Sequence, residues 1–433
     1  AVLRDDADYY EVAPETTWRL DGRGDLVEND YHGVFAELGR ETGKPFVAHG
    51  VGLSLGTPCA SDARRRRRWL RRIARDHAVF RYLWYTDHLG MSSADGHAIS
   101  LPVAIPMTAG RAATVRRALS RMQRIVPRVG FETTAQHFVL GHALDEPAFI
   151  AECLEAPGTH LVLDLHNVVV MADNLGFDPR TYLDGLFAHG VGRRVIEIHV
   201  SGGHVSDPAW LPSRRVLRLD AHDHAVPELV WTLLAEVLPR CPRLLGVTLE
   251  RMEGTVGESD VGVVRDELRR ARAIVAENTG KRGRSPVRRR RPWGRPRPRA
   301  RLDRRTEAWI ESMLARLLLD ADPVAALARA RRADDTPDGA RPMLDAIDAD
   351  GLAMSALLVA RLRFERVTNG SSRALRAFEA DPARFAETFR RYHRDVPPRV
   401  FSVQEEGRAF DRFLGAQIEP APTRRTEART GRR

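Results

Sequence analysis

Through the first 278 residues, short apolar runs rich in β-branched and aromatic residues alternate with longer amphipathic stretches. The longer stretches, such as 109–126 and 226–238, place apolar residues at helical spacing. Strand-like runs that alternate with helices predict a parallel sheet, and nearly continuous apolar runs are typical of strands buried on both faces. The predicted strands are residues 9–12, 45–50, 82–88, 129–132, 160–167, 195–200 and 245–250.

The number of strands indicates a barrel with one strand fewer than usual. A closed (β/α)8 barrel of the TIM type needs eight parallel strands, and the pattern supplies seven. Residues 216–223 form a further apolar run, but it follows His199 too closely for a crossover helix, so we interpret it as a polar loop above the barrel. We therefore predict an α/β fold, a TIM-type (β/α)8 barrel that lacks its first strand, whose place would be before residue 9.

A segment dense in arginine and proline divides the chain. Residues 281–305 contain 13 basic residues and one acidic residue, which accounts for the net charge of +10. Because like charges repel and proline blocks regular pairing, we predict a disordered linker at 280–305. It would separate a barrel at 1–279 from a mainly helical domain at 306–419, and a disordered tail is expected at 420–433.

Charge distribution, hydropathy and cysteine spacing argue against several classes of protein. The positive charge is concentrated in the linker, so we do not expect a folded face that binds nucleic acid. No apolar run is long enough to span a membrane. The three cysteines, Cys59, Cys153 and Cys241, are far apart and form no CxxC pair, so neither a disulfide framework nor a thiolate metal site is indicated. We expect a cytoplasmic protein.

Residues of the types that bind metals recur where the predicted strands end. In barrels of this type, catalytic residues project from the carboxyl ends of the strands. A single histidine there carries little information, because buried histidines are often only hydrogen-bonded; recurrence at nearly every strand is what favours a site. The candidates are His49, Asp87, His88, Glu132, Asp164, His166, Asn167, His199 and Glu250, with Asp220 and His222 from the loop.

This set of side chains predicts a centre that holds more than one metal ion. Imidazole and carboxylate together suit iron, manganese or zinc, and the lack of thiolate argues against structural zinc. Burying so many ionisable groups together without a cation would be costly. The ligands exceed the needs of one ion, whereas two or three ions bridged by carboxylates would use them all.

The same residues carry a resemblance to a known family. The motifs are HGVGLSLG (49–56), DHL (87–89), LDLHN (163–167), EIHVSG (197–202), DAHD (220–223) and LER (249–251). In this order they resemble the motifs of the multinuclear non-haem iron-dependent oxidative enzymes, the family of the methanobactin-synthesis enzyme. The resemblance spans about residues 9–255 and implies a TIM-type barrel with two or three irons, in mixed Fe(II) and Fe(III) states. Such an enzyme uses O₂ to modify a side chain of a ribosomally made precursor peptide, often a cysteine.

The resemblance also assigns ligands residue by residue. The implied metal ligands are His49, His88, Glu132, Asp164, Asn167, His199, Asp220, His222 and Glu250. Of these, His49, Glu132 and His199 would be catalytic. This chain departs from the family pattern at Thr133, where the family has Asn, and at Asp87, where it has Glu. The family's N-terminal GVGLR strand is absent or reduced to AVLR, which agrees with the count of strands.

Residues 385–414 carry a second resemblance, to the helical partner proteins that accompany these enzymes and help to hold the precursor peptide. Enzyme and partner would then be fused through the linker. Two other functions stay open. A divalent-metal barrel enzyme of the xylose-isomerase-like type, an isomerase or an endonuclease, also places Glu, Asp and His at its strand ends. Alternatively, the chain binds nucleic acid through its arginine-rich linker.

Overall fold

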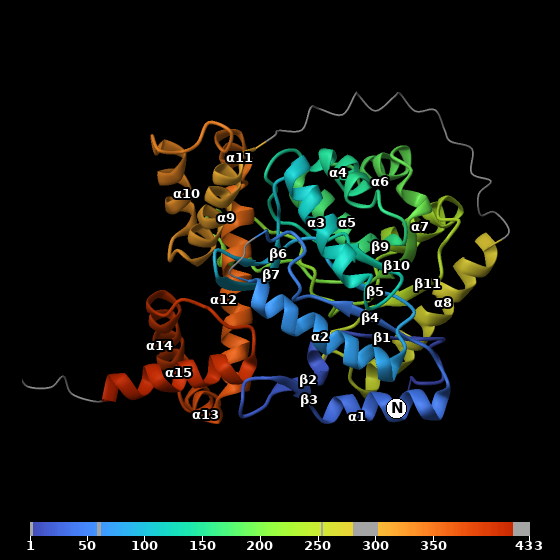
Figure 1. Cartoon of the computed structure of the whole chain (residues 1–433), viewed down its shortest axis with the longest axis horizontal. Helices are drawn as coiled ribbons and strands as arrows, with labels where there is room; N and C mark the ends of the chain where they lie inside the picture. The colour runs from blue at the N-terminus through green and yellow to red at the C-terminus, as the bar shows by residue number, and fades with distance from the viewer. Residues whose placement is uncertain (1–2, 59–61, 253, 280–301, 419–433) are drawn as a thin grey trace, which may run out of the picture.

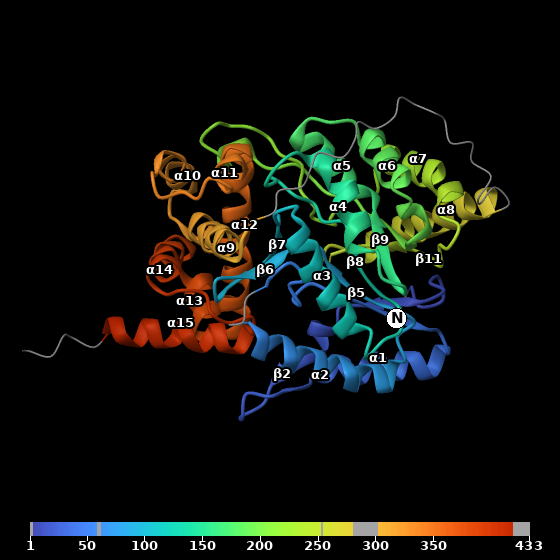
Figure 2. The ribbon, with the colours of Figure 1, turned by 45° about the horizontal axis from the view of Figure 1, so that its top comes forward.

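The computed structural model describes residues 3–58, 62–252, 254–279 and 302–418. Within these ranges the chain forms a parallel barrel and a group of helices that packs against it (Figures 1 and 2). The predicted tail, nearly all of the predicted linker and Cys59 lie outside the described residues. None of the described helices combines the length and the apolar character needed to cross a membrane.

Seven parallel strands form the sheet at the centre of the barrel, in the order β1-β4-β5-β8-β9-β10-β11. The strands are β1 (Tyr10–Val12), β4 (Phe46–Gly50), β5 (Tyr85–His88), β8 (Val129–Glu132), β9 (Thr159–Asp164), β10 (Val195–Val200) and β11 (Gly246–Leu249). Six of them lie within predicted strands, and the predicted parallel sheet is confirmed. The exception is β9, which starts one residue before the predicted 160–167 and ends at Asp164, because α5 begins at Leu165. The apolar run at 216–223 does not join this sheet and forms a loop, as predicted.

Helices that follow the strands lie around the sheet (Figure 1), and their apolar residues form part of the barrel's hydrophobic core. Their apolar positions at helical spacing supply these residues, and burial of apolar surface stabilises the barrel by roughly 25 cal/mol per Å². The helices are α1 (Asp30–Thr42), α2 (Ala63–Phe80), α3 (Ala109–Met122), α4 (Glu146–Cys153), α5 (Leu165–Leu175), α6 (Pro179–Ala188), α7 (Glu228–Val237) and α8 (Val261–Thr279).

Side chains bring the two edge strands of the sheet together. The Tyr9 hydroxyl, beside β1, hydrogen-bonds to Thr248 Oγ1 of β11 at 2.6 Å and donates to Glu197 Oε1 of β10 at 2.9 Å. Gly246 leaves room for this ring, because a Cβ there would collide with the Tyr9 hydroxyl. The sheet is thus a nearly closed barrel that is completed by tyrosine, threonine and glutamate contacts rather than by an eighth strand among the described residues.

Two hairpins that the hydrophobic pattern did not predict interrupt the alternation of strands and helices. One pairs β2 (Trp18–Leu20) with β3 (Leu26–Glu28), and the other pairs β6 (Met91–Ala94) with β7 (His97–Val103). The second hairpin turns at Asp95-Gly96, where both residues have positive φ, as a tight two-residue hairpin turn requires. The Asp95 backbone N–H donates to Glu311 Oε1 at 3.0 Å, so this hairpin connects the barrel to the C-terminal helices.

The C-terminal region is helical, as predicted, and its helices fall into two groups (Figure 1). The first group shares the barrel's hydrophobic core through residues such as Ile310, Leu314 and Leu352. The second group has its own aromatic core, which includes Phe385 and Phe410. The helices are α9 (Arg304–Leu319), α10 (Pro323–Arg332), α11 (Arg341–Ala346), α12 (Ala349–Gly370), α13 (Ser372–Ala380), α14 (Pro382–Asp395) and α15 (Val403–Ile418).

The second helical group contains a buried ion pair whose loss we expect to destabilise it. Arg363 Nε contacts Glu406 Oε1 at 2.8 Å, and each side chain is 1% exposed. The same oxygen accepts a hydrogen bond from the Tyr392 hydroxyl at 2.6 Å. Glu406→Ala leaves the guanidinium buried without its carboxylate, so we expect the free energy of unfolding in urea to fall by about 3–5 kcal/mol.

The exposed pair between Arg361 and Glu365, 3.1 Å apart on α12, offers a matched control. Glu365→Ala is expected to change the free energy of unfolding by only about 0.3–0.5 kcal/mol, because exposed pairs are screened by water. Equal effects of the two substitutions would contradict the importance of the buried pair.

Candidate metal centre

The carboxyl ends of the strands bring the predicted ligands together on one side of the barrel. His49, His88, Glu132, Asp164 and His199 lie at or within one residue of the ends of β4, β5, β8, β9 and β10. The remaining predicted ligands are Glu250, directly after β11, Asn167, in the first turn of α5, and Asp220 and His222, on the loop between β10 and α7. Parallel strands bring their carboxyl ends to one edge, so residues far apart in sequence share one site.

These predicted ligands form a ring of side chains, and Glu132 lies at its centre. Its Oε2 atom is 2.8 Å from His88 Nε2 and 3.3 Å from His49 Nε2, and its Oε1 atom is 3.2 Å from His199 Nδ1. All of these side chains are buried or nearly so. A single carboxylate therefore faces three imidazoles, an arrangement in which both of its oxygens could bridge metal ions.

Glu250 connects His199 with the loop that carries His222 and Asp220. Its Oε1 atom is 3.2 Å from His199 Nδ1, and its Oε2 atom is 3.6 Å from His222 Nε2. His222 Nε2 also lies 2.7 Å from Asp220 Oδ1. Glu132, Asp164, His199 and Glu250 offer ligand atoms that all lie within 4.8 Å of one another.

Asp164 and Asn167 are held by local backbone geometry. Asp164 caps α5 and accepts a hydrogen bond from the Asn167 backbone N–H at 2.6 Å, while the Asn167 side-chain amide donates to the Thr133 carbonyl at 3.0 Å. The Thr133 hydroxyl accepts from the Asp164 backbone N–H at 3.2 Å. Thr133, one of the departures from the family pattern, thus positions the end of β9 rather than facing the ring.

Many ligand atoms of the ring are buried and make no hydrogen bond among the described residues. Buried polar atoms normally find a hydrogen-bond partner, so a group of buried atoms at one place that make ion-pair contacts at most needs an explanation. These atoms are His49 Nε2, Asp164 Oδ2, Asn167 Oδ1, both ring nitrogens of His199, His222 Nε2 and Glu250 Oε2. Their nitrogen and oxygen chemistry fits iron, manganese or zinc.

Electrostatics within the ring also fit a bound cation. Burial lowers the pKa of His88, but the charge and hydrogen bond of Glu132, the Gly50 carbonyl and the charge of Asp87 together raise it to about 10. In the same way Asp220 and Glu250 raise the pKa of His222 to about 11 against the effect of burial. Burial, reinforced by the neighbouring carboxylates, raises the pKa of Asp164 well above its ordinary value. The negative charge of the carboxylates therefore favours positive charge beside them, which protons or metal ions can supply.

Two carboxylates that the sequence analysis did not select approach the far side of His199. Glu11 Oε2 is 3.2 Å from His199 Nε2, and Glu197 Oε1 is 3.8 Å from the same atom. Glu197 also accepts hydrogen bonds from Trp84 and Thr248, at 2.7 and 2.6 Å, so it is firmly held. Both could have been noticed: Glu11 is a charge within a strand, and Glu197 lies two residues before His199, on the same strand face.

Two sequence candidates lie at the margin of the ring. They are Asp87 and His166, which the family resemblance does not assign as metal ligands. Asp87 turns toward the loop after β4, where its Oδ2 atom accepts a hydrogen bond from the Leu53 backbone N–H at 3.1 Å. Burial, with the charge of Glu15, raises the pKa of Asp87 to about 7. His166 Nδ1 is 3.4 Å from Asp220 Oδ1, so His166 contacts one predicted ligand from outside the ring.

Comparison with known proteins identifies the family. A family model described as "RiPP precursor modification enzyme MbnB/TglH/ChrH" matches residues 1–276. The chain belongs to this family. The match covers the whole barrel and ends near the end of α8, so the C-terminal helices lie beyond it.

Curated relatives and solved structures are similar to this chain to different extents. A UPF0276 protein of Caulobacter vibrioides is 34% identical over 250 residues, 56% of this chain and 81% of that protein. A UPF0276 protein of Alcanivorax borkumensis is 29% identical over 233 residues, 52% and 70% of the two chains. Among structures, endonuclease IV of Thermus thermophilus is 17% identical with a TM-score of 0.37, covering 62% and 90%. This structural likeness is weak, and the strand order of the chain itself establishes the barrel.

In this member of the family, a C-terminal helix supports the loop that carries Asp220 and His222. Leu217 and Leu219 of the loop form a buried cluster with Met354 of α12. Arg215 Nη1 contacts both carboxylate oxygens of Asp348, just before α12, at 2.9 and 3.0 Å. The position of two predicted ligands therefore depends on helices outside the part of the chain that the family model matches.

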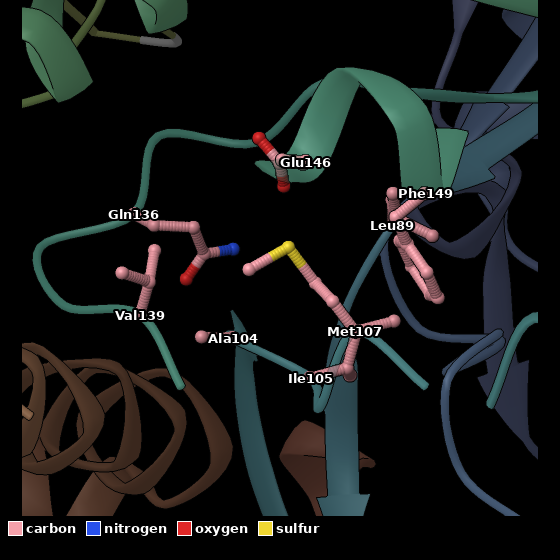
Figure 3. A pocket seen from close by; sticks show the side chains of 8 residues that line it. All are labelled: Leu89, Ala104, Ile105, Met107, Gln136, Val139, Glu146 and Phe149. Atoms are coloured by element: carbon pink, nitrogen blue, oxygen red, sulfur yellow. The ribbon is translucent and has the colours of Figure 1, made fainter. Parts of the chain in front are cut away.

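A small hollow lies beside the segment that follows β5. It is lined in part by Leu89, which directly follows His88, and by Gln136, in the loop after β8. Figure 3 shows the Met107 side chain reaching between Gln136 and Glu146. The lining is mostly apolar, and Glu146 is the ionisable group in it.

We expect Glu146 to make the stability of the fold depend on pH. Burial raises its pKa from 4.5 to about 7, although a hydrogen bond from the Tyr182 hydroxyl, 2.6 Å away, lowers it. A carboxyl with a raised pKa stabilises the fold while it is protonated, and this stabilisation is lost as the pH rises through the folded-state pKa. Glu146→Gln keeps an acceptor for Tyr182 and cannot ionise.

The measurement is the free energy of unfolding as a function of pH for this variant and the unaltered chain. The variant should gain relative stability as the pH rises from about 5 to about 8 and match the unaltered chain near pH 4. Glu236→Gln, at an exposed carboxylate that pairs with Arg180, provides the control and should show no such gain. Parallel profiles for the unaltered chain and Glu146→Gln would contradict the assignment.

Proposed function

We propose that this protein is a multinuclear iron-dependent oxidase that uses O₂ to modify a side chain, expected to be cysteine, of a ribosomally made precursor peptide. The proposal is carried by the ring of nitrogen and oxygen ligands, whose buried atoms are too many for one ion. It is further supported by membership of a family of RiPP precursor modification enzymes.

The ring divides into three overlapping sets that could each hold an ion. His49 and His88, which both contact Glu132 Oε2, form the first set with that carboxylate. Glu132 with Asp164, His199 and Glu250 forms the second. The third set consists of Asp220, His222 and Glu250, while the Asn167 side chain lies beside Glu132, with its amide nitrogen 3.4 Å from Oε1. Glu132 and Glu250 each belong to two sets, so these carboxylates would be shared between neighbouring sets.

Neighbouring groups orient the histidines of the ring. His49 Nδ1 is hydrogen-bonded to Thr86 Oγ1 at 2.8 Å, and His88 Nδ1 to the Gly50 carbonyl at 3.0 Å. Each contact directs the Nε2 atom of that imidazole toward Glu132. Similarly, Glu11 beside His199 Nε2 leaves Nδ1 to face Glu132 and Glu250. Such outer contacts set the tautomer and raise the basicity of metal-ligating imidazoles.

Iron accounts for the ligand set and for the proposed chemistry. Imidazole and carboxylate are ligands of non-haem iron, and the ring contains no thiolate of its own that would favour a structural zinc. Iron bound there would supply one-electron and O₂ chemistry together with a binding position for a substrate thiolate. The residues of the chain supply orientation and burial, and His49, Glu132 and His199, which lie in contact at the centre of the site, are the proposed catalytic residues.

The substrate would reach the ring from the side where the loops and C-terminal helices lie. The helical region at 306–419 is proposed to act as a fused module that recognises the precursor peptide. Support comes from α12, which contacts the loop of Asp220 through Met354 and continues into the second helical group. A peptide held by these helices would therefore lie near the strand ends.

The deciding experiment measures metal and turnover in substituted proteins. His49→Ala and Glu132→Ala should lower bound iron, determined by elemental analysis and Mössbauer spectra of anaerobically purified protein. Both should also lower O₂ uptake in the presence of a cysteine-containing peptide from a small neighbouring reading frame, where the genome supplies one. The expected loss is at least about 100-fold, larger than the loss from disturbing an outer contact alone. Deleting residues 281–305 should leave iron binding intact.

Other outcomes would favour the alternatives. Zinc or manganese in place of iron, with no O₂ uptake, would point to an isomerase or endonuclease of the xylose-isomerase-like barrel type. Binding of nucleic acid that is abolished by deleting 281–305 and unaffected by His49→Ala would point to a nucleic-acid-binding protein.

The support of the Asp220 loop by α12 gives a separate prediction. Met354 is fully buried against Leu217 and Leu219, and its truncation to Ala should cost about 2–5 kcal/mol of stability. Because the loop is loosened, the iron content should fall by about one ion per chain while the first two sets remain filled. Leu357→Ala, at an exposed position of the same helix, should leave the iron content unchanged. Equal iron content in both variants would contradict the supporting role of Met354.

A further inference from the structure

A second group of potential ligands lies outside the ring, on the same loop region. His204 Nδ1 is 2.6 Å from Asp223 Oδ2, and His224 Nδ1 is 2.7 Å from Asp223 Oδ1. The two imidazole rings lie 5.7 Å apart, centre to centre. Each of the three residues offers a ligand atom, and these atoms lie within 4.8 Å of one another. None of the three belongs to the ring described above.

The backbone holds the two segments that carry these residues in a defined arrangement. The Leu219 N–H donates to the His204 carbonyl at 3.0 Å, and the His224 N–H donates to the Gly202 carbonyl at 3.3 Å. Gly202 allows this close approach, because a Cβ there would collide with the backbone of residues 224 and 225. The triad is therefore preorganised by hydrogen bonds that do not involve its own side chains.

The triad is accessible, in contrast to the ring. The side chains of His204, Asp223 and His224 are 33%, 23% and 62% exposed. Solvent or a substrate group could thus complete the coordination of an ion held there. Two imidazoles and one carboxylate are a set that binds divalent transition-metal ions with open positions. Calcium and magnesium are disfavoured because they select oxygen ligands.

The separations require little movement to accept an ion. Ligand atoms about 2.1 Å from a tetrahedral ion lie roughly 3.4 Å from one another. The observed nitrogen–oxygen distances of 2.6 and 2.7 Å would therefore open by less than about 1 Å. Ring members show similarly short contacts, such as 2.7 Å between His222 and Asp220.

We propose that His204, Asp223 and His224 form an auxiliary site for a divalent transition-metal ion at the edge of the ring. The ion would join residues 202–204 to residues 223–224 and so hold the loop that carries Asp220 and His222. Its open positions face solvent, where a thiolate or carboxylate of a bound molecule could reach them. This site does not depend on iron, O₂ or a peptide substrate.

The test uses the full chain, stripped with a chelator and titrated with Co²⁺ in the absence of O₂. Cobalt per chain is measured after desalting, together with the visible absorption of the bound ion. His224→Ala and Asp223→Asn are each expected to bind one ion fewer than the unaltered chain, with the remaining ions retained. Their retention shows that the barrel and ring are folded. His189→Ala, at the end of α6, is the matched histidine control and should bind as many ions as the unaltered chain.

Two results would overturn the proposal. Unchanged cobalt content and absorption in both variants would show that the triad is a hydrogen-bonded contact alone. Loss of all cobalt in either variant would show that the triad is not separate from the ring. Because Co²⁺ binding is measured without iron or substrate, failure of the auxiliary site and failure of the proposed oxidase function can be told apart.

Discussion

The carboxylate of Glu132 faces three imidazoles inside the barrel, and the rest of the site is arranged around this contact. A buried carboxylate is costly unless positive charge and hydrogen-bond donors surround it. His49, His88 and His199 come from three different strands, so their convergence requires those strands to end at the same level. Glu250 repeats the arrangement between His199 and the loop of Asp220. In both groups the positive charge of protonated imidazoles offsets the negative charge of the carboxylates. Metal cations can replace these protons.

The barrel meets this requirement although its sheet contains seven strands. Tyr9 spans from the side of β1 to Thr248 of β11, and Glu197 accepts hydrogen bonds from both. Glu197 also lies next to His199, so the contacts that bring the edge strands together also hold a residue at the centre of the ring. Glu11 of β1 approaches the same imidazole. The same contacts therefore close the barrel and orient His199.

Local pattern predicted the seven strands and the ring, because buried parallel strands are continuous apolar runs and their ends have a fixed place in the fold. Other features depend on information that this pattern does not carry. Glu11 reads as a polar interruption of a strand until the position of His199 is known. Asp95-Gly96 is a recognisable hairpin signal, yet the contact of this hairpin with Glu311 joins residues more than two hundred positions apart. The core shared by Ile310 and the barrel is likewise a tertiary property.

The loop between β10 and α7 is where these long-range contacts matter most. It carries Asp220 and His222 and, in His204, Asp223 and His224, the residues of the auxiliary site. His222 adopts a φ of 53°, a left-handed conformation that is uncommon for residues other than glycine. The barrel supplies one constraint through the hydrogen bond from the Met252 N–H to the His222 carbonyl, and α12 supplies another through Met354. A loop fixed from both sides can present ligands as accurately as a strand end does. For this reason the C-terminal helices belong to the architecture of the site as well as to the proposed recognition of a peptide.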